Sequence, residues 1–336
     1  MHQIAFIGFR HSHILGLYEF AQKSPAFNIT GACEENVAAR AVLRRDGKVN
    51  LTHSRYAAML DAVECDIVAV GDYYGRRGQL IIEALRRGKH VVADKPICTR
   101  LTELSEIERL ARKNRLSVFC QLDMRGFGQF LKARELVSAG TIGEIHAIHV
   151  TGQHPLMLGS RPGWYFEKGK HGGTINDIAV HAFDFIPWLT GLQFAEVVAA
   201  RTWNAFATPH RQFKDAAQFL LKMNNGTGVF GDVSYSMPDS QGYTLPQYWR
   251  TTLYGRAGII EIGANLPGVW LARAGEEIPQ TIPAAPAQPF YYLEALTREI
   301  AGKKTGLALT TPEVLAASRL ALSVQSAADN DRKINL

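Results

Sequence analysis

The chain has 336 residues, a length that favours two domains over one core. Hydrophobic residues make up 46% and charged residues 20%, as in a folded globular protein, and no apolar run approaches the roughly 18 to 20 residues of a membrane helix. The formal net charge is +6, but basic residues are interspersed with acidic ones and accompany no nucleic-acid-binding motif. We therefore expect neither a membrane nor a nucleic-acid partner.

The N-terminus and the cysteines indicate the compartment. Residues 1–7 have no basic leader or cleavage site and are typical of a first strand, so we expect a cytoplasmic protein. The four cysteines, at positions 33, 65, 98 and 120, form no CxxC pair and have no histidine at zinc-finger spacing. We expect buried thiols, and no bound metal.

The first 122 residues alternate short apolar runs with amphipathic stretches. Val, Ile and Ala dominate the runs, as in strands buried on both faces of a parallel sheet. The predicted strands are Ile4–Ile7, Asn28–Cys33, Asp66–Val70, His90–Ala93 and Ser117–Gln121. The helical stretches Gly78–Arg87 and Leu101–Arg115 lie between them. This order predicts a doubly wound parallel sheet over residues 1–122, with ligands at the carboxyl ends of its strands.

The pattern changes after residue 123. A predicted helix at Gly128–Ala139 is followed by longer strands, and residues 229–235 alternate between two faces with a period of two. Asn224-Asn225-Gly226 indicates a hairpin turn. Two further helices are expected near 290–301 and 312–329. Residues 123–336 are therefore predicted to form a second α/β domain with a largely antiparallel open sheet.

The first strand is followed by the turn Gly8-Phe9-Arg10-His11-Ser12-His13. A dinucleotide-binding turn carries three glycines, which let backbone N–H groups approach a pyrophosphate at a helix N-terminus. Only Gly8 is present; Arg10 and His13 replace the other two, so an ordinary surface turn is an equal interpretation. Glu34 ends the second strand, where an acid can bind ribose hydroxyls, although a solvated helix-start carboxylate is also common there.

Asp177, His181 and Asp184 have the spacing i, i+4 and i+7, so they share one face of a predicted helix. Histidine titrates near neutral pH, which suits a general acid or base. Two other interpretations stay open: a helix-start acid beside a structural histidine, and a metal site. We rank metal low because no further ligand cluster lies nearby in the sequence.

Two segments resemble the Gfo/Idh/MocA oxidoreductases, the family of glucose-fructose oxidoreductase and inositol dehydrogenase. Residues 83–96, EALRRGKHVVADKP, are similar to the family's A-L-x-x-G-K-H-V-x-x-E-K-P, with Asp94 in place of Glu. Residues 172–184, GGTINDIAVHAFD, are similar to its GG…D-x-G-x-H-x-x-D. The resemblance implies an N-terminal Rossmann domain and a C-terminal domain for substrate binding and oligomerisation.

The resemblance also implies roles for individual residues. Lys95 is expected to contact both the substrate hydroxyl and the nicotinamide, with a surface lysine as the alternative. His181 would exchange the hydroxyl proton and Asp177 would bind the substrate. The expected cofactor-binding residues are Gly8, Phe9, Arg10, His11, Ser12, His13, Glu34, Gly71, Asp72, Tyr73, Asp94 and Lys95. Arg125, Trp164 and Tyr165 are expected at the substrate, with Asp177 and His181; hydrophobic packing explains the two aromatic residues equally well.

The chain departs from the family at two places. The family's P-N-x-x-H is here Tyr73-Tyr74-Gly75-Arg76-Arg77, which makes a standard sugar substrate less certain. Arg10 stands in place of the second glycine of the turn, and we expect its guanidinium to take over the phosphate contact.

The resulting hypothesis is an NAD(P)-dependent dehydrogenase that moves hydride between nicotinamide and a hydroxyl-bearing carbon of a sugar, polyol or related compound. The carboxylate of Glu34 would repel a 2′-phosphate, so NAD is expected over NADP. The resemblance implies a homodimer or homotetramer. Two alternatives remain: a hydrolase or lyase that oxidises its substrate transiently and retains NAD, and a non-catalytic regulator that senses a cofactor or sugar.

Overall fold

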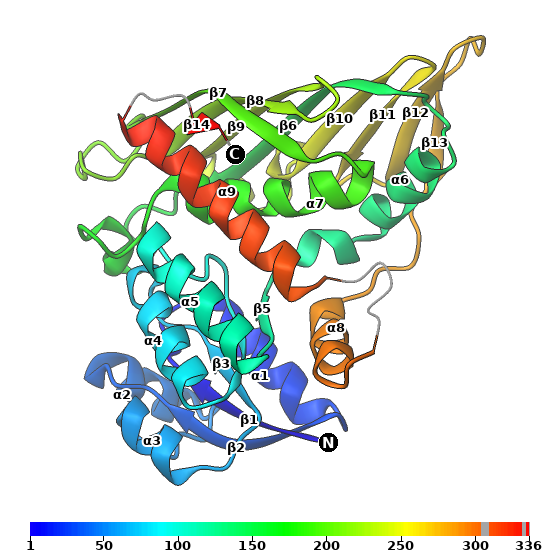
Figure 1. The fold of residues 1–336 in the computed structure, drawn as a ribbon. Coiled ribbons are helices and arrows are strands. Elements are labelled where there is room, and N and C mark those ends of the chain that lie inside the picture. The colour runs from blue at the N-terminus through cyan, green and yellow to red at the C-terminus, as the bar shows by residue number, and fades with distance from the viewer. Residues whose placement is uncertain (304–308, 331–333, 336) are drawn as a thin grey trace. The chain divides into compact units, whose positions relative to one another are not determined.

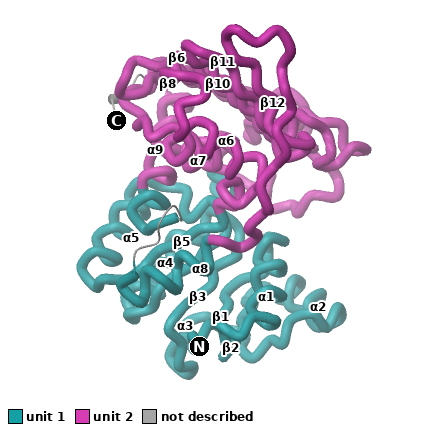
Figure 2. Tube along the Cα trace, turned by 90° about the vertical axis from the view of Figure 1, so that its right-hand side faces the viewer, with its two compact units in different colours: residues 1–121, 169–172, 292–315 teal, residues 122–168, 173–291, 316–336 magenta. Residues whose placement is uncertain are grey.

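The computed structural model describes residues 1–303, 309–330 and 334–335 (Figure 1). These residues form two compact units (Figure 2). Unit 1 comprises Met1–Gln121, Gly169–Gly172 and Tyr292–Leu315; unit 2 comprises Leu122–Lys168, Gly173–Tyr291 and Ala316–Leu336. The first boundary thus lies within a residue of the predicted one. The two later segments of unit 1 differ from the sequence analysis, which assigned everything after residue 122 to the second domain.

Unit 1 contains the predicted parallel sheet. Its strands are β1 (His2–Ile7), β2 (Phe27–Cys33), β3 (Ile67–Val70), β4 (His90–Ala93) and β5 (Val118–Cys120), in the order β2-β1-β3-β4-β5. The helices are α1 (His13–Lys23), α2 (Val37–Asp46), α3 (Tyr56–Ala62), α4 (Tyr74–Arg86), α5 (Leu101–Asn114) and α8 (Tyr291–Ile300). The strand order reverses at β1, which lies between β2 and β3. In open α/β sheets ligands bind at such a reversal, beside the carboxyl ends of the strands.

Unit 2 contains the second sheet. Its nine strands in the described chain run in the order β13-β12-β11-β10-β6-β9-β8-β7-β14, and neighbours are antiparallel except β6 and β9. Their bounds are β6 Ile145–Pro155, β7 Phe194–Trp203, β8 Ala216–Met223, β9 Gly228–Met237, β10 Arg250–Gly255, β11 Gly258–Gly263, β12 Gly268–Arg273, β13 Gln280–Pro283 and β14 Ile334–Asn335. The predicted hairpin joins β8 to β9, closed by a bond from Gly226 N to Met223 O of 3.0 Å. The largely antiparallel sheet is confirmed.

The other helical segments complete the two units. The α-helices are α6 (Gly128–Ser138), α7 (Val180–Thr190) and α9 (Thr311–Asn330), and α9 crosses the division between the units. The short helices are η1 (Asp123–Gly126), η2 (Gly163–Phe166), the π-helical η3 (Ile175–Ala179), η4 (Asp239–Gln241) and η5 (Pro246–Tyr248). Among the described residues, no helix combines the length and apolar character needed to cross a membrane. All four cysteines are buried, as expected.

One face of the unit 2 sheet carries a row of side chains across six strands. Strand register makes neighbours of Leu220 and Phe230, Phe230 and His149, His149 and Thr252, Thr252 and Glu261, and Glu261 and Trp270. Leu220, Phe230 and Trp270 are exposed. The residues that precede and follow them point to the opposite face and are largely buried, as the alternation of a strand requires.

Candidate active site

The turn after β1 packs directly against the end of β3. Gly8 has φ of +79°, and a Cβ atom at this residue would lie 2.7 Å from Cβ of Asp72. A Cβ atom at Gly71 would lie 2.4 Å from Cβ of Ile14, in α1. Both positions therefore require glycine, and the turn, the end of β3 and the start of α1 form one tightly packed group.

Glu34 lies beneath this turn. It is fully buried, and its two carboxylate oxygens accept hydrogen bonds of 2.7 Å from the backbone N–H groups of Phe9 and Asn36. Burial raises the pKa of Glu34. The partly exposed acid here is the next residue, Glu35, which is paired with Arg76. The sequence analysis gave Glu35 no role and expected Glu34 to bind ribose hydroxyls, with a solvated helix-start carboxylate as the alternative.

Arg10, Asp72 and Tyr73 lie together, as a shared cofactor role requires. The Nε atom of Arg10 is 3.8 Å from Oδ1 of Asp72, and its guanidinium lies 4.7 Å from the centre of the Tyr73 ring. Asp72 is held in place by a 2.7 Å bond from Tyr73 N and a 2.9 Å bond from the hydroxyl of Tyr56. This group joins the Gly8 turn to the N-terminus of α4.

Arg77 organises the turn that carries Lys95. Its fully buried guanidinium donates to the backbone oxygens of Lys95 and Pro96. It also donates to Oδ2 of Asp94 at 2.9 Å and to the backbone oxygen of Asp72 at 2.7 Å. Lys95 follows β4 and is only 5% exposed. Arg77 occupies the position at which the family's P-N-x-x-H has its histidine. This departure from the family pattern was the one sequence signal that pointed to Arg77.

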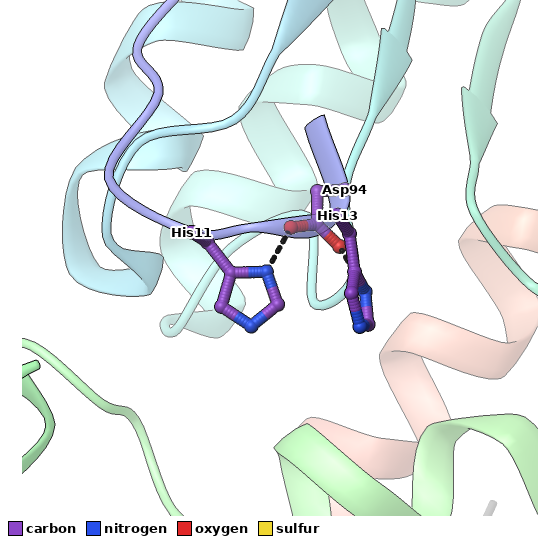
Figure 3. Close-up of side chains that lie close together, drawn as sticks. All are labelled: His11, His13 and Asp94. Carbon is purple, nitrogen blue, oxygen red and sulfur yellow. Dashed lines mark hydrogen bonds and ion pairs between the residues drawn. The ribbon is translucent and has the colours of Figure 1, made fainter. Parts of the chain in front are cut away.

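Asp94 joins two histidines of the Gly8 turn and α1 (Figure 3). Its Oδ2 atom contacts Nδ1 of His11, and its Oδ1 atom lies 3.2 Å from Nδ1 of His13. Burial lowers the pKa of His11 to about 4 despite the neighbouring carboxylate, so this imidazole is neutral at pH 7. Burial opposes ionisation of Asp94, yet the permanent charge of Arg77 holds its pKa well below the usual range. His11 Nδ1–H therefore donates to Asp94, and Nε2 accepts from the Tyr74 hydroxyl at 3.2 Å.

In unit 2, Asp177 and His181 lie where a π-helical turn passes into a helix. Asp177 is within the turn Ile175–Ala179 and His181 is in the first turn of α7. A single regular helix was expected here; the π turn alters the spacing of side chains, and such turns are frequent at functional sites. Both side chains are at least nine-tenths buried.

Asp177 is paired with a tyrosine that the sequence analysis did not select. The hydroxyl of Tyr235, in β9, donates to Oδ2 of Asp177. Burial and the Asp177 carboxylate raise the pKa of Tyr235. The guanidinium of Arg161 lies 4.6 Å from the Tyr165 ring centre and 5.1 Å from that of Tyr235. In the sequence, Tyr235 is one member of an alternating strand, and nothing there separates it from the apolar members.

Aromatic rings surround these polar residues. The ring of Trp164 stacks on Tyr165 at 4.1 Å, so the two predicted substrate residues form one pair. Trp249 packs edge-on against His181, with ring centres 5.4 Å apart, and against His154 at 5.8 Å. Sequence reasoning missed both Trp249 and His154, which come from segments that carried no motif.

Arg125 has a partner that the sequence analysis did not foresee. Its Nε and Nη2 atoms donate to the two carboxylate oxygens of Asp184 at 2.9 and 2.6 Å. Both residues are almost fully buried. The pair fastens η1 to α7, the helix that carries His181. The pair holds the Arg125 guanidinium in place, and a contact between Arg125 and the substrate stays a prediction.

Comparison with known proteins places these features in a family. A model described as the oxidoreductase family, NAD-binding Rossmann fold, matches residues 3–122, and a model of the GFO/IDH/MocA C-terminal domain matches residues 130–261. A solved oxidoreductase structure from Thermotoga maritima has a TM-score of 0.85 and 24% identity, covering 99% of this chain and all of that one.

Two curated relatives have named activities. Myo-inositol 2-dehydrogenase of Thermotoga maritima is 26% identical over 141 residues, covering 42% of this chain and 41% of that protein. Levoglucosan dehydrogenase of Pseudarthrobacter phenanthrenivorans is 23% identical over 248 residues, covering 73% and 60%. The matched regions span only 30% to 63% of the first four curated relatives. The two family models together cover most of the chain, and the protein belongs to the GFO/IDH/MocA family.

Proposed function

We propose that the protein is an NAD-dependent dehydrogenase that oxidises a hydroxyl-bearing carbon of a sugar, polyol or related compound, or catalyses the reverse reaction. One observation carries the proposal: Lys95 lies buried at the carboxyl end of β4, with its backbone bound by Arg77, in the sheet that the NAD-binding family model matches. This is the edge of an open α/β sheet at which ligands bind.

The proposed cofactor site is the group around the Gly8 turn. The first turn of α1 contains no acidic residue, so its N-terminus suits an anion. Arg10 supplies a guanidinium beside this terminus, and the side chain of Ser12, the N-cap residue, does not cap the helix. We propose that Arg10 and Ser12 bind the pyrophosphate that a second glycine would otherwise approach.

NAD is proposed over NADP. Glu34, Glu35 and Asp72 bring three carboxylates to the ends of β2 and β3, and a 2′-phosphate would add a like charge beside them. Two guanidiniums, of Arg10 and Arg76, lie close by, but each already pairs with one of these carboxylates. We expect NAD to bind more tightly than NADP in a direct titration, and equal affinities would contradict this proposal.

The proposed reaction needs a hydride acceptor and a proton acceptor. The nicotinamide, when bound, accepts hydride at C4 from the carbon that carries the hydroxyl. His181 removes the hydroxyl proton, Lys95 stabilises the negative charge that develops on the oxygen, and Asp177 accepts hydrogen bonds from substrate hydroxyls. The products are the carbonyl compound, the reduced nicotinamide and one proton. Inositol and levoglucosan, named for the two relatives, suggest a polyol or sugar substrate.

We propose that the exposed row on the unit 2 sheet is the subunit interface of a homodimer or homotetramer. The row combines Leu220, Phe230 and Trp270 with His149, Thr252 and Glu261, so it presents both apolar and polar groups. Exposed apolar side chains gathered on one face favour association. Sedimentation analysis of the wild type and of Phe230→Glu tests it, and a wild-type monomer would contradict it.

Replacement of Lys95 and His181 tests the chemistry. Alanine at either position is expected to lower kcat by roughly 10² to 10⁴ with a polyol or sugar that the wild type oxidises. His181→Ala should still bind NAD, because this residue belongs to unit 2. Lys113→Ala and His146→Ala, which remove exposed residues of the same types, are the matched controls and should keep full activity. A Lys95→Ala variant with near wild-type turnover would exclude the assignment.

A further inference from the structure

Three side chains of unit 1 bring metal-binding atoms together. His11 and His13 are separated by one residue at the start of α1, and Asp94 follows β4. One nitrogen of each imidazole and one oxygen of the carboxylate all lie within 4.8 Å of one another. Figure 3 shows the two rings on either side of the carboxylate.

The spacing is close to that of a coordination site. Donors bound to one tetrahedral metal at about 2.1 Å lie roughly 3.4 Å apart. The atoms His13 Nδ1 and Asp94 Oδ1 are already 3.2 Å apart. The side chain of His13 is 46% exposed, so its ring can rotate to complete the set without disturbing the core.

The surrounding groups match those that support metal ligands. A metal-bound imidazole usually donates its second N–H to a nearby acceptor, and a ligating carboxylate usually accepts a further hydrogen bond. The Tyr74 oxygen lies 3.2 Å from Nε2 of His11, where it can accept this bond once Nδ1 binds a metal. Arg77 already donates to Asp94 at 2.9 Å.

We propose that His11, His13 and Asp94 bind a divalent transition-metal ion, with Zn²⁺, Co²⁺ or Ni²⁺ as the class of ligand. Two imidazoles and one carboxylate favour these ions over Mg²⁺ and Ca²⁺, which prefer oxygen donors. Three protein ligands leave a fourth position open to water or a small molecule. The sequence analysis did not consider these three residues as ligands; it ranked metal low at Asp177, His181 and Asp184 because no further ligand cluster lies nearby in the sequence.

His11 and His13 belong to the Gly8 turn of the proposed cofactor site, so the test uses protein freed of metal and of NAD. Zn²⁺ is titrated by calorimetry at pH 7, and Co²⁺ is followed by its visible absorption, which reports coordination directly. We expect one ion per chain, and no measurable binding of Mg²⁺ at the same concentration.

Single replacements locate the ion. His13→Ala and His11→Ala should each weaken Zn²⁺ binding at least tenfold, because each removes a ligand. His146→Ala removes an exposed histidine of unit 2 and should bind as the wild type does. Unfolding of the metal-free variants is measured alongside; because His11 is buried, His13→Gln is the second variant should His11→Ala fail to fold.

Three results would overturn the proposal. The first is no Zn²⁺ binding to the wild type, which would mean that the three side chains form a hydrogen-bonded network only. The second is unchanged affinity in His13→Ala and His13→Gln, which would put the ion elsewhere. The third is an equal loss in His146→Ala, which would indicate nonspecific binding to surface histidines.

Discussion

The candidate site residues of unit 1 and those of unit 2 are held by different forces. In unit 1, Arg77, Asp94, Asp72 and Arg10 fix one another through charged hydrogen bonds and ion pairs. In unit 2, the Tyr235 hydroxyl donates to Asp177, and His181 packs against the indole ring of Trp249. Charged contacts suit a site for an anionic dinucleotide, which needs fixed donors. Aromatic walls with few polar groups are typical of pockets for small uncharged substrates.

Each unit nevertheless contains a buried arginine–aspartate pair. The two pairs differ in the other groups that the arginine binds. Arg125 contacts its partner Asp184 through both the carboxylate and the backbone oxygen. Arg77 binds Asp94 and, in addition, the backbone of Asp72, Lys95 and Pro96. Loss of Arg77 should therefore disturb the position of Lys95 as well as the fold.

The largest effect is expected from removing either arginine. Arg77→Met and Arg125→Met should each lower the free energy of unfolding by about 3 to 5 kcal/mol, because each removes the guanidinium that balances the charge of a buried carboxylate. Urea unfolding measures this loss. The conservative Arg77→Lys retains the charge but not the fork of donors, so it should lower kcat with little change in KM for NAD. A loss below about 1 kcal/mol in Arg77→Met would contradict the role of Arg77.

Arg10→Ala tests whether the charged side chains of unit 1 bind the cofactor. A hydrogen bond to a charged group contributes about 1.5 to 3 kcal/mol, so NAD affinity should fall about 10- to 100-fold. Thermal stability without cofactor should barely change, since Arg10 belongs to a loop. Titration of NAD into the variant measures the change, with Arg44→Ala, an exposed arginine of α2, as the control. Unchanged affinity would show that the turn binds the cofactor through other groups.

Tyr235→Phe tests the aromatic part in unit 2. The change removes the hydroxyl that donates to Asp177 and keeps the ring. We expect a rise in KM for the sugar or polyol of about tenfold and no change in NAD affinity. Tyr254→Phe, in β10, where the ring contacts His149, is the matched control. A loss of NAD affinity in Tyr235→Phe would contradict the assignment of NAD binding to unit 1 and of substrate binding to unit 2.

Local patterns predicted much of the fold. Apolar runs located all five strands of unit 1 to within two residues, because strands buried on both faces carry continuous Val, Ile and Ala. The hairpin at Asn224-Asn225-Gly226 followed from turn chemistry. The return of Tyr292–Leu315 to unit 1 could not be predicted, because it depends on distant contacts such as Val118 N to Thr311 Oγ1 at 2.9 Å.

Motif positions selected Lys95, Asp177 and His181, and their roles stay predictions. Arg77 and Tyr235 were missed, because a buried arginine and a strand tyrosine acquire their roles from partners that are remote in the sequence. Glu34 was expected at a ribose, and in the structure its carboxylate accepts from the backbone N–H groups of Phe9, in the turn, and of Asn36, before α2.

Net reduction of NAD tests the central claim most directly. The protein is mixed with NAD and a panel of polyols and sugars that includes inositol and levoglucosan, and nicotinamide absorbance is followed together with substrate consumption. The account predicts one reduced nicotinamide for each substrate molecule oxidised, with turnover lowered in His181→Ala and Lys95→Ala. Substrate consumption without net reduction would contradict it and identify an enzyme that oxidises transiently; NAD binding without any consumption across the panel would favour a sensor.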